Sequence, residues 1–397
     1  MTEIIVSTVF WICFLGLVYS YALYPLILLC WRAFRRRSGL GNAPASIPAE
    51  VTLPTVSVVI AAYNEEAIIG KKIENIRSTD YPGERIEFLV GSDGSTDSME
   101  DRLASSGITS LKVLRFAQRR GKAAVLNDLI ASAQGEIIVF SDANTLYEPT
   151  TIRRLVGSFS DPSIGGAVGE LSLVTQGNTL AEHAESFYWR YENSLKMCES
   201  DIFTTLGGIG PLYAIRKSLF IPLPSSKIVM DDFLVGLAVL ARGFRVVYDP
   251  HARGYEDTSG SVSQEFRRKT RIALGNYSGI SEFYGLLSPR HGFVAFALWS
   301  HKILRWMGWA FLLAMIGASA YLAGDSPFFR FVCVLEIASA ALVALGAVAE
   351  RLQLRIGVLG MPYHFIAMNA ALALGFVKFL AGRRQPSWEV IRHKEPL

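Results

Sequence analysis

The chain has 397 residues, of which 51% are hydrophobic and only 19% are charged, and its formal net charge is +4. Soluble domains carry about 25% charged residues, and the deficit here lies at the two ends of the chain, so an ordinary water-soluble protein is not expected. The small net charge does not favour a nucleic-acid-binding protein. The four cysteines form no C-x-x-C pair, so neither a disulfide framework nor a zinc site is predicted.

An apolar stretch of about 28 residues, 4–31, exceeds the roughly 20 that are needed to span a bilayer. A basic cluster follows this stretch instead of preceding it, which is the reverse of a secretory signal peptide. The positive-inside rule then places residue 32 onward in the cytoplasm. We therefore expect residues 1–37 to form an N-terminal membrane helix with a basic anchor. The basic cluster consists of Arg32, Arg35, Arg36 and Arg37.

Three further candidate spans lie near residues 303–323, 328–349 and 362–381, in a C-terminal membrane region and tail that covers 303–397. Four spans in total would leave the tail outside, although its basic residues favour the cytoplasmic side. One C-terminal segment is therefore expected to be re-entrant or interfacial. The basic residues of the tail are Arg383, Arg384, Arg392 and Lys394.

The middle of the chain is predicted to be an α/β domain over residues 56–260, reached through a Gly- and Pro-containing linker, 38–55. Short apolar runs alternate with helical patterns, which predicts a mostly parallel sheet with helices on both faces. Asn64 is expected to cap the helix that follows the first strand. The strands are predicted over residues 56–60, 87–90, 111–116 and 136–141, and helices over 121–133, about 179–200 and from about 231.

Polar side chains follow the predicted strands directly, at Tyr63, Asn64, Asp93 and Asp142. The carboxyl ends of parallel strands meet at one edge of a sheet, where ligands bind, so these residues are expected to gather there. Asp93 could hydrogen-bond a ribose or a base, or its segment could simply be a turn with a helix cap. Its glycine spacing does not match G-x-G-x-x-G, so no dinucleotide fingerprint is present.

Asp142 and Asn144 lie on alternate residues past a strand end and could direct two oxygens at one Mg²⁺ or Mn²⁺, shared with substrate phosphates. The alternative is that they cap a turn. Lys122 is predicted at a helix start, where a cation is unfavourable unless an anion lies nearby; an ordinary solvated lysine is the alternative. Asp231 and Asp232 are predicted at another helix start, either for the helix dipole or with one of them as a general base.

Residues 261–302 are amphipathic and predict interface helices at the membrane surface. A cationic helix face is expected here, because its members follow an i, i+3, i+4, i+7 spacing, and it would suit a diphosphate. Anionic lipid headgroups are one alternative, and a capping box from Ser261 is another for the glutamine. Trp189, with Tyr188 and Tyr191, could stack on a sugar but is more commonly core. The face comprises Gln264, Arg267, Arg268 and Arg271.

Together these motifs resemble the family 2 membrane glycosyltransferases with a GT-A catalytic domain, such as the bacterial poly-N-acetylglucosamine, hyaluronan, chitin and cellulose synthases. The resemblance covers nearly the whole chain, and several ordered motifs carry it. These motifs are Ala62-Tyr63-Asn64-Glu65-Glu66, Ser92 to Asp97, Gly121-Lys122, Asp142-Ala143-Asn144, Gly210-Pro211-Leu212-Tyr213, Asp231-Asp232, and Gln264 to Arg268.

The resemblance implies a role for each matching residue. Asp232 would be the catalytic base, next to Asp231, and Asp142 with Asn144 would hold the metal. Gly210 and Tyr213 would lie on the acceptor side. The nucleotide-sugar would be bound by Ala62, Tyr63, Asn64, Glu65, Asp93, Lys122, Asp142, Gln264, Arg267, Arg268 and Arg271.

Two positions depart from the family pattern. Arg268 stands where processive synthases have the tryptophan of a Q-x-x-R-W motif, which puts processivity in doubt, and Asn144 stands where an aspartate is usual. The resemblance thus implies an inverting, Mg²⁺- or Mn²⁺-dependent transfer from a nucleotide-sugar, expected to be a UDP-sugar, to a lipid-linked or polysaccharide acceptor. The implied location is a bacterial cytoplasmic membrane, multi-pass, with the catalytic domain in the cytosol and room for an accessory subunit. The alternatives are single addition onto a polyprenyl-linked acceptor, a degenerate nucleotide-sugar-binding subunit, and a transporter.

Overall fold

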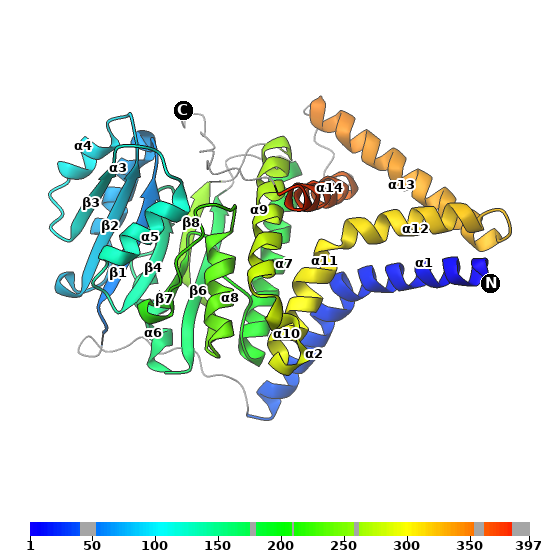
Figure 1. The fold of residues 1–397 in the computed structure, drawn as a ribbon, viewed down its shortest axis with the longest axis horizontal. Helices are drawn as coiled ribbons and strands as arrows, with labels where there is room; N and C mark the ends of the chain where they lie inside the picture. Colours follow the sequence, from blue (N-terminus) through cyan, green and yellow to red (C-terminus); the bar gives the residue numbers. More distant parts are fainter. Residues whose placement is uncertain (40–52, 175–179, 209, 258–261, 353–360, 383–397) are drawn as a thin grey trace.

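The computed structural model describes residues 1–39, 53–174, 180–208, 210–257, 262–352 and 361–382. Most of the predicted linker, the predicted cap at Ser261 and the basic tail therefore lie outside the described residues. The β-sheet lies at one end of the molecule and long apolar helices lie at the other (Figure 1).

The sheet has eight strands in the order β3-β2-β1-β4-β7-β6-β8-β5. Strands β3, β2, β1 and β4 pair in parallel, β7 joins β4 and β6 antiparallel, and β8 runs parallel to β6. The predicted mostly parallel α/β sheet is confirmed, with an antiparallel insertion. The strands are β1 Val56–Ala62, β2 Ile86–Asp93, β3 Leu111–Phe116, β4 Ile137–Asp142, β5 Leu146–Tyr147, β6 Ile164–Val174, β7 Tyr213–Arg216 and β8 Arg245–Asp257.

Helices cover both faces of the sheet because the central strands are apolar on both sides. In β1 every residue is buried, as expected for a strand covered on both faces. Val58 and Ile60 pack into the core beneath α3 and α6, while Val59 and Ala61 pack beneath α5 and α8. The helices on the two faces of the sheet are α3 Glu66–Arg77, α4 Met99–Ala104, α5 Lys122–Ser132, α6 Thr151–Gly157 and α8 Asp231–Ala241.

Two long helices, α7 (Leu180–Ile202) and α9 (Val262–Glu282), stand between the sheet and the apolar helices (Figure 1). α7 packs against β8 and α2, and α9 packs against α8 and α14. Both helices therefore connect the sheet to the apolar part of the chain. The predictions of a long helix at about 179–200 and of an amphipathic helix after 261 are confirmed.

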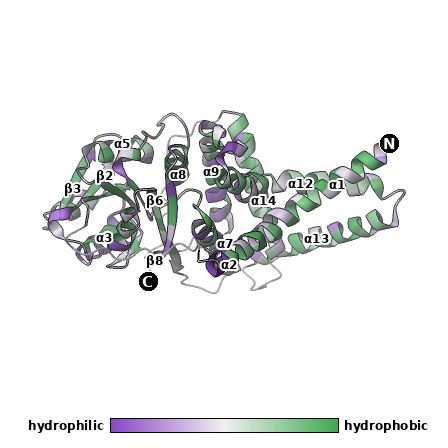
Figure 2. Ribbon diagram, turned by 90° about the horizontal axis from the view of Figure 1, so that it is seen from below, coloured by the Kyte–Doolittle hydropathy of each residue, from purple (hydrophilic) through white to green (hydrophobic). Residues whose placement is uncertain are grey.

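The apolar helices are coloured as strongly hydrophobic along most of their length in Figure 2. Within the described parts of the chain, three helices are long and apolar enough to cross a membrane: Thr2–Arg37, Pro327–Arg351 and Met361–Leu380. The pair Phe293–Trp306 and Gly308–Leu322 also qualifies but is bent by 56°. The elements are α1 Thr2–Val18, α2 Tyr24–Arg37, α10 Phe293–Ala297, α11 Leu304–Trp306, α12 Gly308–Leu322, α13 Pro327–Arg351 and α14 Met361–Leu380.

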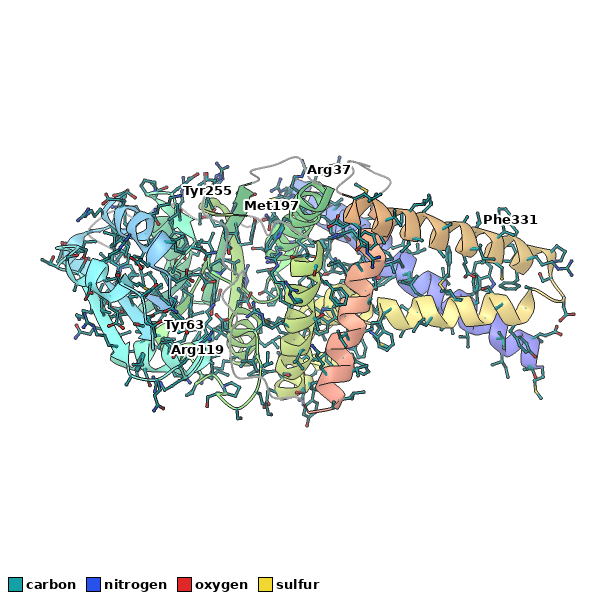
Figure 3. All side chains as sticks on the ribbon, turned by 90° about the horizontal axis from the view of Figure 1, so that it is seen from above. Arg37, Tyr63, Arg119, Met197, Tyr255 and Phe331 are labelled. Atoms are coloured by element: carbon teal, nitrogen blue, oxygen red, sulfur yellow. The ribbon has the colours of Figure 1, made fainter. Side chains whose placement is uncertain are left out.

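The expectation that one C-terminal segment does not simply span fits two features of these helices. The bent pair is one, because a 56° break suits a broken or re-entrant span. The other is α14, which runs across the direction of α12 and α13 in Figure 3. Short π-helical segments interrupt the N-terminal span at Tyr19–Leu23 and the bent pair at Leu298–Ile303.

Candidate active site

Asp93 ends β2 and is completely buried. Its two carboxylate oxygens accept hydrogen bonds from the backbone N–H groups of Arg120 and Gly121, at 2.7 and 2.8 Å. Gly121 has a φ of 91°, a conformation that L-residues with a side chain rarely adopt. Asp93 therefore shapes the turn that leads into Lys122, and its contact with the nucleotide stays a prediction.

Lys122 begins α5 and lies at the centre of the acidic groups. Its ammonium nitrogen is 2.9 Å from an oxygen of Asp142 and 3.5 Å from an oxygen of Asp231. Burial alone would lower the pKa of Lys122, but these two carboxylates and that of Asp232 outweigh it and raise the pKa. The anion predicted beside this helix start thus includes protein carboxylates. Lys122 pairs both with Asp142 at the end of β4 and with Asp231 at the start of α8.

Asp142 ends β4, and Asn144 follows it in a turn. The side-chain amide of Asn144 donates a hydrogen bond to Glu256 of β8 at 2.7 Å, which leaves the amide oxygen of Asn144 as its possible metal ligand. Burial raises the pKa of Glu256 to about 7, and the charge of Asp142 adds to this effect. Two elements far apart in the sequence thus place acidic oxygens around this turn.

A buried lysine of α3 donates hydrogen bonds to the residues on either side of the Asp142–Asn144 turn. Lys72 of α3 is 2% exposed, and its ammonium group donates to the Ser141 hydroxyl at 2.7 Å and to the Thr145 carbonyl at 2.6 Å. Burial lowers the pKa of Lys72 to about 7, against the opposing charge of Asp142. The two bonds hold the residues immediately before and after the Asp142–Asn144 segment.

Asp231 and Asp232 begin α8 but have different surroundings. Asp231 is buried, and its pKa is raised by burial and by Asp232 and Asp142 despite the opposing charge of Lys122. Asp232 is half-buried, and its oxygens accept from the backbone N–H groups of Gly210 and Phe233, both at 2.8 Å. Asp232 is therefore the more accessible carboxylate of the pair.

The glycine-rich turn before β7 packs directly on the start of α8. A side chain at Gly236 would place its Cβ 2.5 Å from the Cα of Gly207, and a side chain at Gly208 would meet Asp232 at 3.0 Å. The predicted acceptor-side residues sit at this turn: Gly210 bonds Asp232, and the Tyr213 hydroxyl donates to Asp231 at 3.4 Å. Glycine is thus required for the close approach that positions Asp232.

The cationic face of α9 reaches the acidic groups through two of its arginines. Loss of solvation lowers the pKa of Arg271 although its side chain is exposed, and the nearby charges of Asp142 and Asp231 oppose this effect. Arg268 bonds Glu265 at 2.7 Å, and its charge acts on Glu256. Arg267 is exposed, and the side chain of Gln264 lies outside the described part. Of the predicted face, Arg268 and Arg271 thus interact electrostatically with the acidic groups.

The residues after β1 form the remaining side of the site. The ring of Tyr63 lies 3.9 Å from the guanidinium of Arg119 (both labelled in Figure 3). Ala62 is fully buried, and burial raises the pKa of Glu65 to about 7, reinforced by Asp142. The flat Tyr63–Arg119 pair borders the acidic site.

The predicted cap at Asn64 is wrong. The helix α3 begins at Glu66, with Glu65 in the capping position, and Asn64 has a φ of 52°. Its side-chain oxygen accepts from the N–H of Thr96 at 2.8 Å, while Asp97 accepts from the N–H of Glu66 at 2.8 Å. The helix start is thus capped from the next turn of the sheet edge, which a local sequence rule does not consider.

Sequence reasoning missed Glu256, Lys72 and Arg119. Glu256 lies near the end of a strand, so the rule that selected Asp142 could have found it. Lys72 interrupts the apolar stripe of α3 formed by Ile69, Ile73 and Ile76, and a lysine within such a stripe is a signal for a buried cation. Arg119 carries no comparable signal.

Comparison with known proteins agrees with these motifs. Residues 57–221 match the model of the family described as glycosyl transferase family 2. The chain is 38% identical over 120 residues to beta-monoglucosyldiacylglycerol synthase of Synechocystis sp.; the matched region is 29% of this chain and only 25% of that protein. The chain is 24% identical over 298 residues to an N-acetylglucosaminyltransferase of Rhizobium meliloti, and this match covers 70% of this chain and 69% of that protein.

The fold is similar to that of the mannosyltransferase PcManGT from Pyrobaculum calidifontis, solved in complex with GDP-Man and Mn²⁺. The TM-score is 0.68 at 23% identity, over 97% of this chain and 100% of that chain. The predicted GT-A-like fold is confirmed. The match of residues 57–221 to the glycosyl transferase family 2 model agrees with the ordered motifs of the sequence.

Proposed function

We propose that this protein is an inverting glycosyltransferase that moves a sugar from a nucleotide-sugar, a UDP-sugar in the first instance, to a hydroxyl of a membrane-linked acceptor. The observation that carries the proposal is the meeting of Asp142 and Asp231 on Lys122, at 2.9 and 3.5 Å. It brings the end of β4 to the start of α8, beside the half-buried carboxylate of Asp232. The helices α7 and α9 separate this point from the apolar helices (Figure 1).

The donor would lie along the carboxyl ends of β1, β2 and β4. The Tyr63–Arg119 pair offers a flat, cationic surface on which a base can stack. Arg271 and Arg268 would contact the diphosphate, because guanidinium groups bind phosphate oxygens in bidentate fashion. Lys122 would add a further positive charge at the same place.

The residues of the Asp142 turn fit a divalent cation. Burial first, and the charge of Asp142 second, raise the pKa of both Glu256 and Glu65 to about 7; a cation bound beside them would favour their ionised forms. Asp142 and the amide oxygen of Asn144 would hold the cation. Among the described side chains, no group of three His, Cys, Asp or Glu residues could hold a metal ion; the proposed cation would take further oxygens from the donor phosphates. The cation would supply charge stabilisation for the departing diphosphate.

The reaction would proceed by in-line displacement at the anomeric carbon. Asp232 accepts the proton of the acceptor hydroxyl as that oxygen forms a bond to the anomeric carbon. The bond from this carbon to the diphosphate oxygen breaks, and its electron pair leaves with the nucleoside diphosphate. Lys122, Arg268 and Arg271 would stabilise the charge that develops on the leaving group.

A single addition onto a lipid acceptor is the form of the reaction that we favour. Arg268 stands in place of the tryptophan that processive synthases carry, and one relative is named as a glucosyldiacylglycerol synthase. Polymer synthesis and a non-catalytic nucleotide-sugar-binding subunit are the alternatives. The proposed location is a bacterial inner membrane, with the domains divided at about residues 37, 55, 260 and 302 and the sheet in the cytosol.

The test uses the purified full-length protein in lipid nanodiscs, with Mn²⁺ or Mg²⁺ and a panel of nucleotide-sugars. Release of nucleoside diphosphate and the labelled products would be measured. The proposal expects one donor to be turned over into discrete lipid-soluble products, and Asp232→Asn to abolish this turnover. High-molecular-weight product would favour the polymerase, and nucleotide-sugar binding without turnover would favour the binding subunit.

A further inference from the structure

One face of α7 carries buried polar atoms with unused hydrogen-bonding capacity. Trp189, Asn193 and Lys196 follow at i, i+4 and i+7, so they lie on the same side of the helix. Within the described chain, the indole nitrogen of Trp189 and the side-chain oxygen of Asn193 are buried without a hydrogen-bond partner. Buried polar atoms are paired in the great majority of native structures, so two orphaned atoms on one helical face call for an explanation.

Lys196 continues this face and is also poorly satisfied. The residue is 7% exposed, and among the described residues its ammonium group makes one long hydrogen bond, 3.4 Å to the Gly208 carbonyl. An ammonium group has three donors. Lys72, by contrast, makes two short hydrogen bonds, and Lys122 faces two carboxylates. Lys196 is thus a buried cation with capacity to bind further oxygens.

This face ends at the proposed catalytic base. Gly208, the partner of Lys196, donates its own N–H to the backbone carbonyl of Asp232 at 3.1 Å, and Gly210 bonds the Asp232 side chain at 2.8 Å. Burial, together with the charge of Lys302, lowers the pKa of Lys196 to about 8, against the opposing charges of Glu192, Asp232 and Glu199. A group bound along Trp189, Asn193 and Lys196 would therefore lead directly to Asp232.

Glu192 and Glu199, which lie three or four residues from Trp189 or Lys196 and so flank the same face of α7, meet the apolar helices through buried charges. His301 lies between Glu192 and Glu199, at 3.0 and 2.6 Å, and Arg305 lies 2.5 Å from Glu192. Burial alone would raise the pKa of Glu192, but Arg305, His301 and Lys302 outweigh it and hold this pKa well below its usual range. The Tyr24 hydroxyl of α2 donates to Glu199 at 2.7 Å.

Cations gather at this junction among the described residues. Glu192 and Glu199 face His301, Lys302 and Arg305, and Lys196 adds a further cation, on which Glu192, Asp232 and Glu199 act electrostatically. Both apolar segments that meet here contain a π-helical turn, and Tyr19 and Ser300 of these turns are hydrogen-bonded at 2.8 Å. Such turns occur frequently at functional sites. The spare donors of Lys196, with Lys302 nearby, would suit an anion that arrives from the side of the apolar helices.

We propose that Trp189, Asn193 and Lys196, together with Lys302, form the subsite for the head of a membrane-lipid acceptor that carries both a hydroxyl and an anionic group. This inference rests on the proposed function. The anionic oxygens accept from Lys196 and Lys302, the Asn193 oxygen accepts from a hydroxyl, and the Trp189 N–H donates to an oxygen of the head. The lipid chains remain among the apolar helices, while the reacting hydroxyl reaches Asp232.

The experiment measures transfer by the full-length protein in phosphatidylcholine nanodiscs, with the nucleotide-sugar that the wild type turns over. Phosphatidylglycerol and phosphatidylinositol serve as anionic hydroxylated acceptors, diacylglycerol as a neutral one, and free glycerol phosphate as a water-soluble one. We expect the anionic lipids to be the better acceptors. Lys196→Met should raise their KM by about tenfold or more, because a buried charge-assisted hydrogen bond is lost, while the KM for the donor stays unchanged.

Two milder variants keep the test informative if Lys196→Met fails to fold. Trp189→Phe removes one N–H and retains the ring, and Asn193→Leu removes the amide at similar volume; each should raise the acceptor KM several-fold. Lys112→Met is the control, because the exposed side chain of Lys112 lies on β3 and pairs with Glu87, away from α7.

An unchanged acceptor KM in folded variants would overturn the subsite, and a wild-type preference for diacylglycerol would overturn its anionic character. Equal use of free glycerol phosphate would overturn the lipid assignment. If the wild type turned over no nucleotide-sugar at all, the proposed function itself would fail, and this inference with it.

Discussion

The side-chain amide of Asn144 donates a hydrogen bond to a carboxylate oxygen of Glu256 across 2.7 Å and 112 positions of sequence. This bond orients the Asn144 amide so that its oxygen is available beside Asp142. A carboxylate that orients a metal ligand from behind typically contributes 10- to 100-fold to metal affinity. The relationship therefore gives Glu256 a part in the proposed cation site that no local pattern indicates.

Glu256→Gln should weaken activation of the enzyme by Mn²⁺. The glutamine retains the size of the side chain but removes its charge, so we expect about tenfold more Mn²⁺ to be needed for half-maximal activity. Titration of Mn²⁺ into chelator-treated protein at saturating donor provides the measurement. Glu84→Gln, at an exposed position of the 3-10 turn Gly83–Arg85, is the control and should leave the titration unchanged. An identical Mn²⁺ requirement in both variants would remove Glu256 from the site.

Asp232→Asn should abolish transfer while the protein stays folded. Positioned general bases contribute about 10²–10⁴-fold to rate, so kcat should decrease by a factor in that range. The KM for the donor should change little. The matched variant is Asp231→Asn, which removes a buried partner of Lys122 and should act on donor binding and on thermal stability. Steady-state kinetics of both variants and their melting temperatures separate the two roles. A larger loss of kcat in Asp231→Asn would reverse the assignment.

Lys72 should make the stability of the protein depend on pH above neutrality. Its pKa is lowered to about 7 in the folded state, whereas an unfolded lysine titrates near 10.5, so the unfolded chain binds more protons between these values. Stability should therefore rise with pH across this window, by at most about 1.4 kcal/mol per pH unit. Below pH 7 the protonated lysine is buried at full cost.

Lys72→Met removes this titrating group and provides the comparison. Melting temperatures of the wild type and the variant, measured between pH 7 and 10, should converge as the pH rises if the wild type gains stability from deprotonation. The variant should also require more Mn²⁺, because the bonds to Ser141 and Thr145 are lost. Parallel curves for the two proteins would show that Lys72 keeps its usual pKa.

Two glycine substitutions should have opposite effects on stability. Gly236→Ala places a methyl group 2.5 Å from the Cα of Gly207, and overpacking of this kind costs about 1–3 kcal/mol. Gly70→Ala, at an exposed position within α3 with nothing in reach of its Cβ, should stabilise the protein by about 0.5–1 kcal/mol. Thermal unfolding of the two variants measures the difference. Reduced activity of Gly236→Ala would also follow, because the displaced turn carries Gly210.

The positions of the central strands and of the polar residues at the carboxyl edge of the sheet could be predicted from the sequence. Buried parallel strands are short apolar runs, and the residues that follow them meet at one edge for any parallel sheet. Tyr63 and Asp142 were located in this way, whereas Asp232 was predicted at a helix start. The antiparallel insertion of β7 was not, because a short apolar run carries no information on the direction of its partner.

Residue roles that depend on contacts between distant elements could not be predicted. Asn64 is a residue type that commonly caps helices, yet its side chain accepts from the N–H of Thr96 in the turn after β2. The carboxylate of Asp93 accepts from the backbone of Arg120 and Gly121, which its place at a strand end does not indicate. In both cases a second segment supplies the hydrogen-bond partner that local rules assign to a neighbour.

The sequence by itself determined the order of strands and helices, the apolar helices at both ends and the carboxylates at the strand ends, because these follow from periodicity and from residue type. Only the tertiary structure decided that Lys122 joins Asp142 to Asp231, that Lys72 lies beneath the Asp142 turn, and that α7 turns Lys196 toward Asp232. The physical reason is that a side chain finds its partner through the register of packed elements, and no local pattern encodes that register.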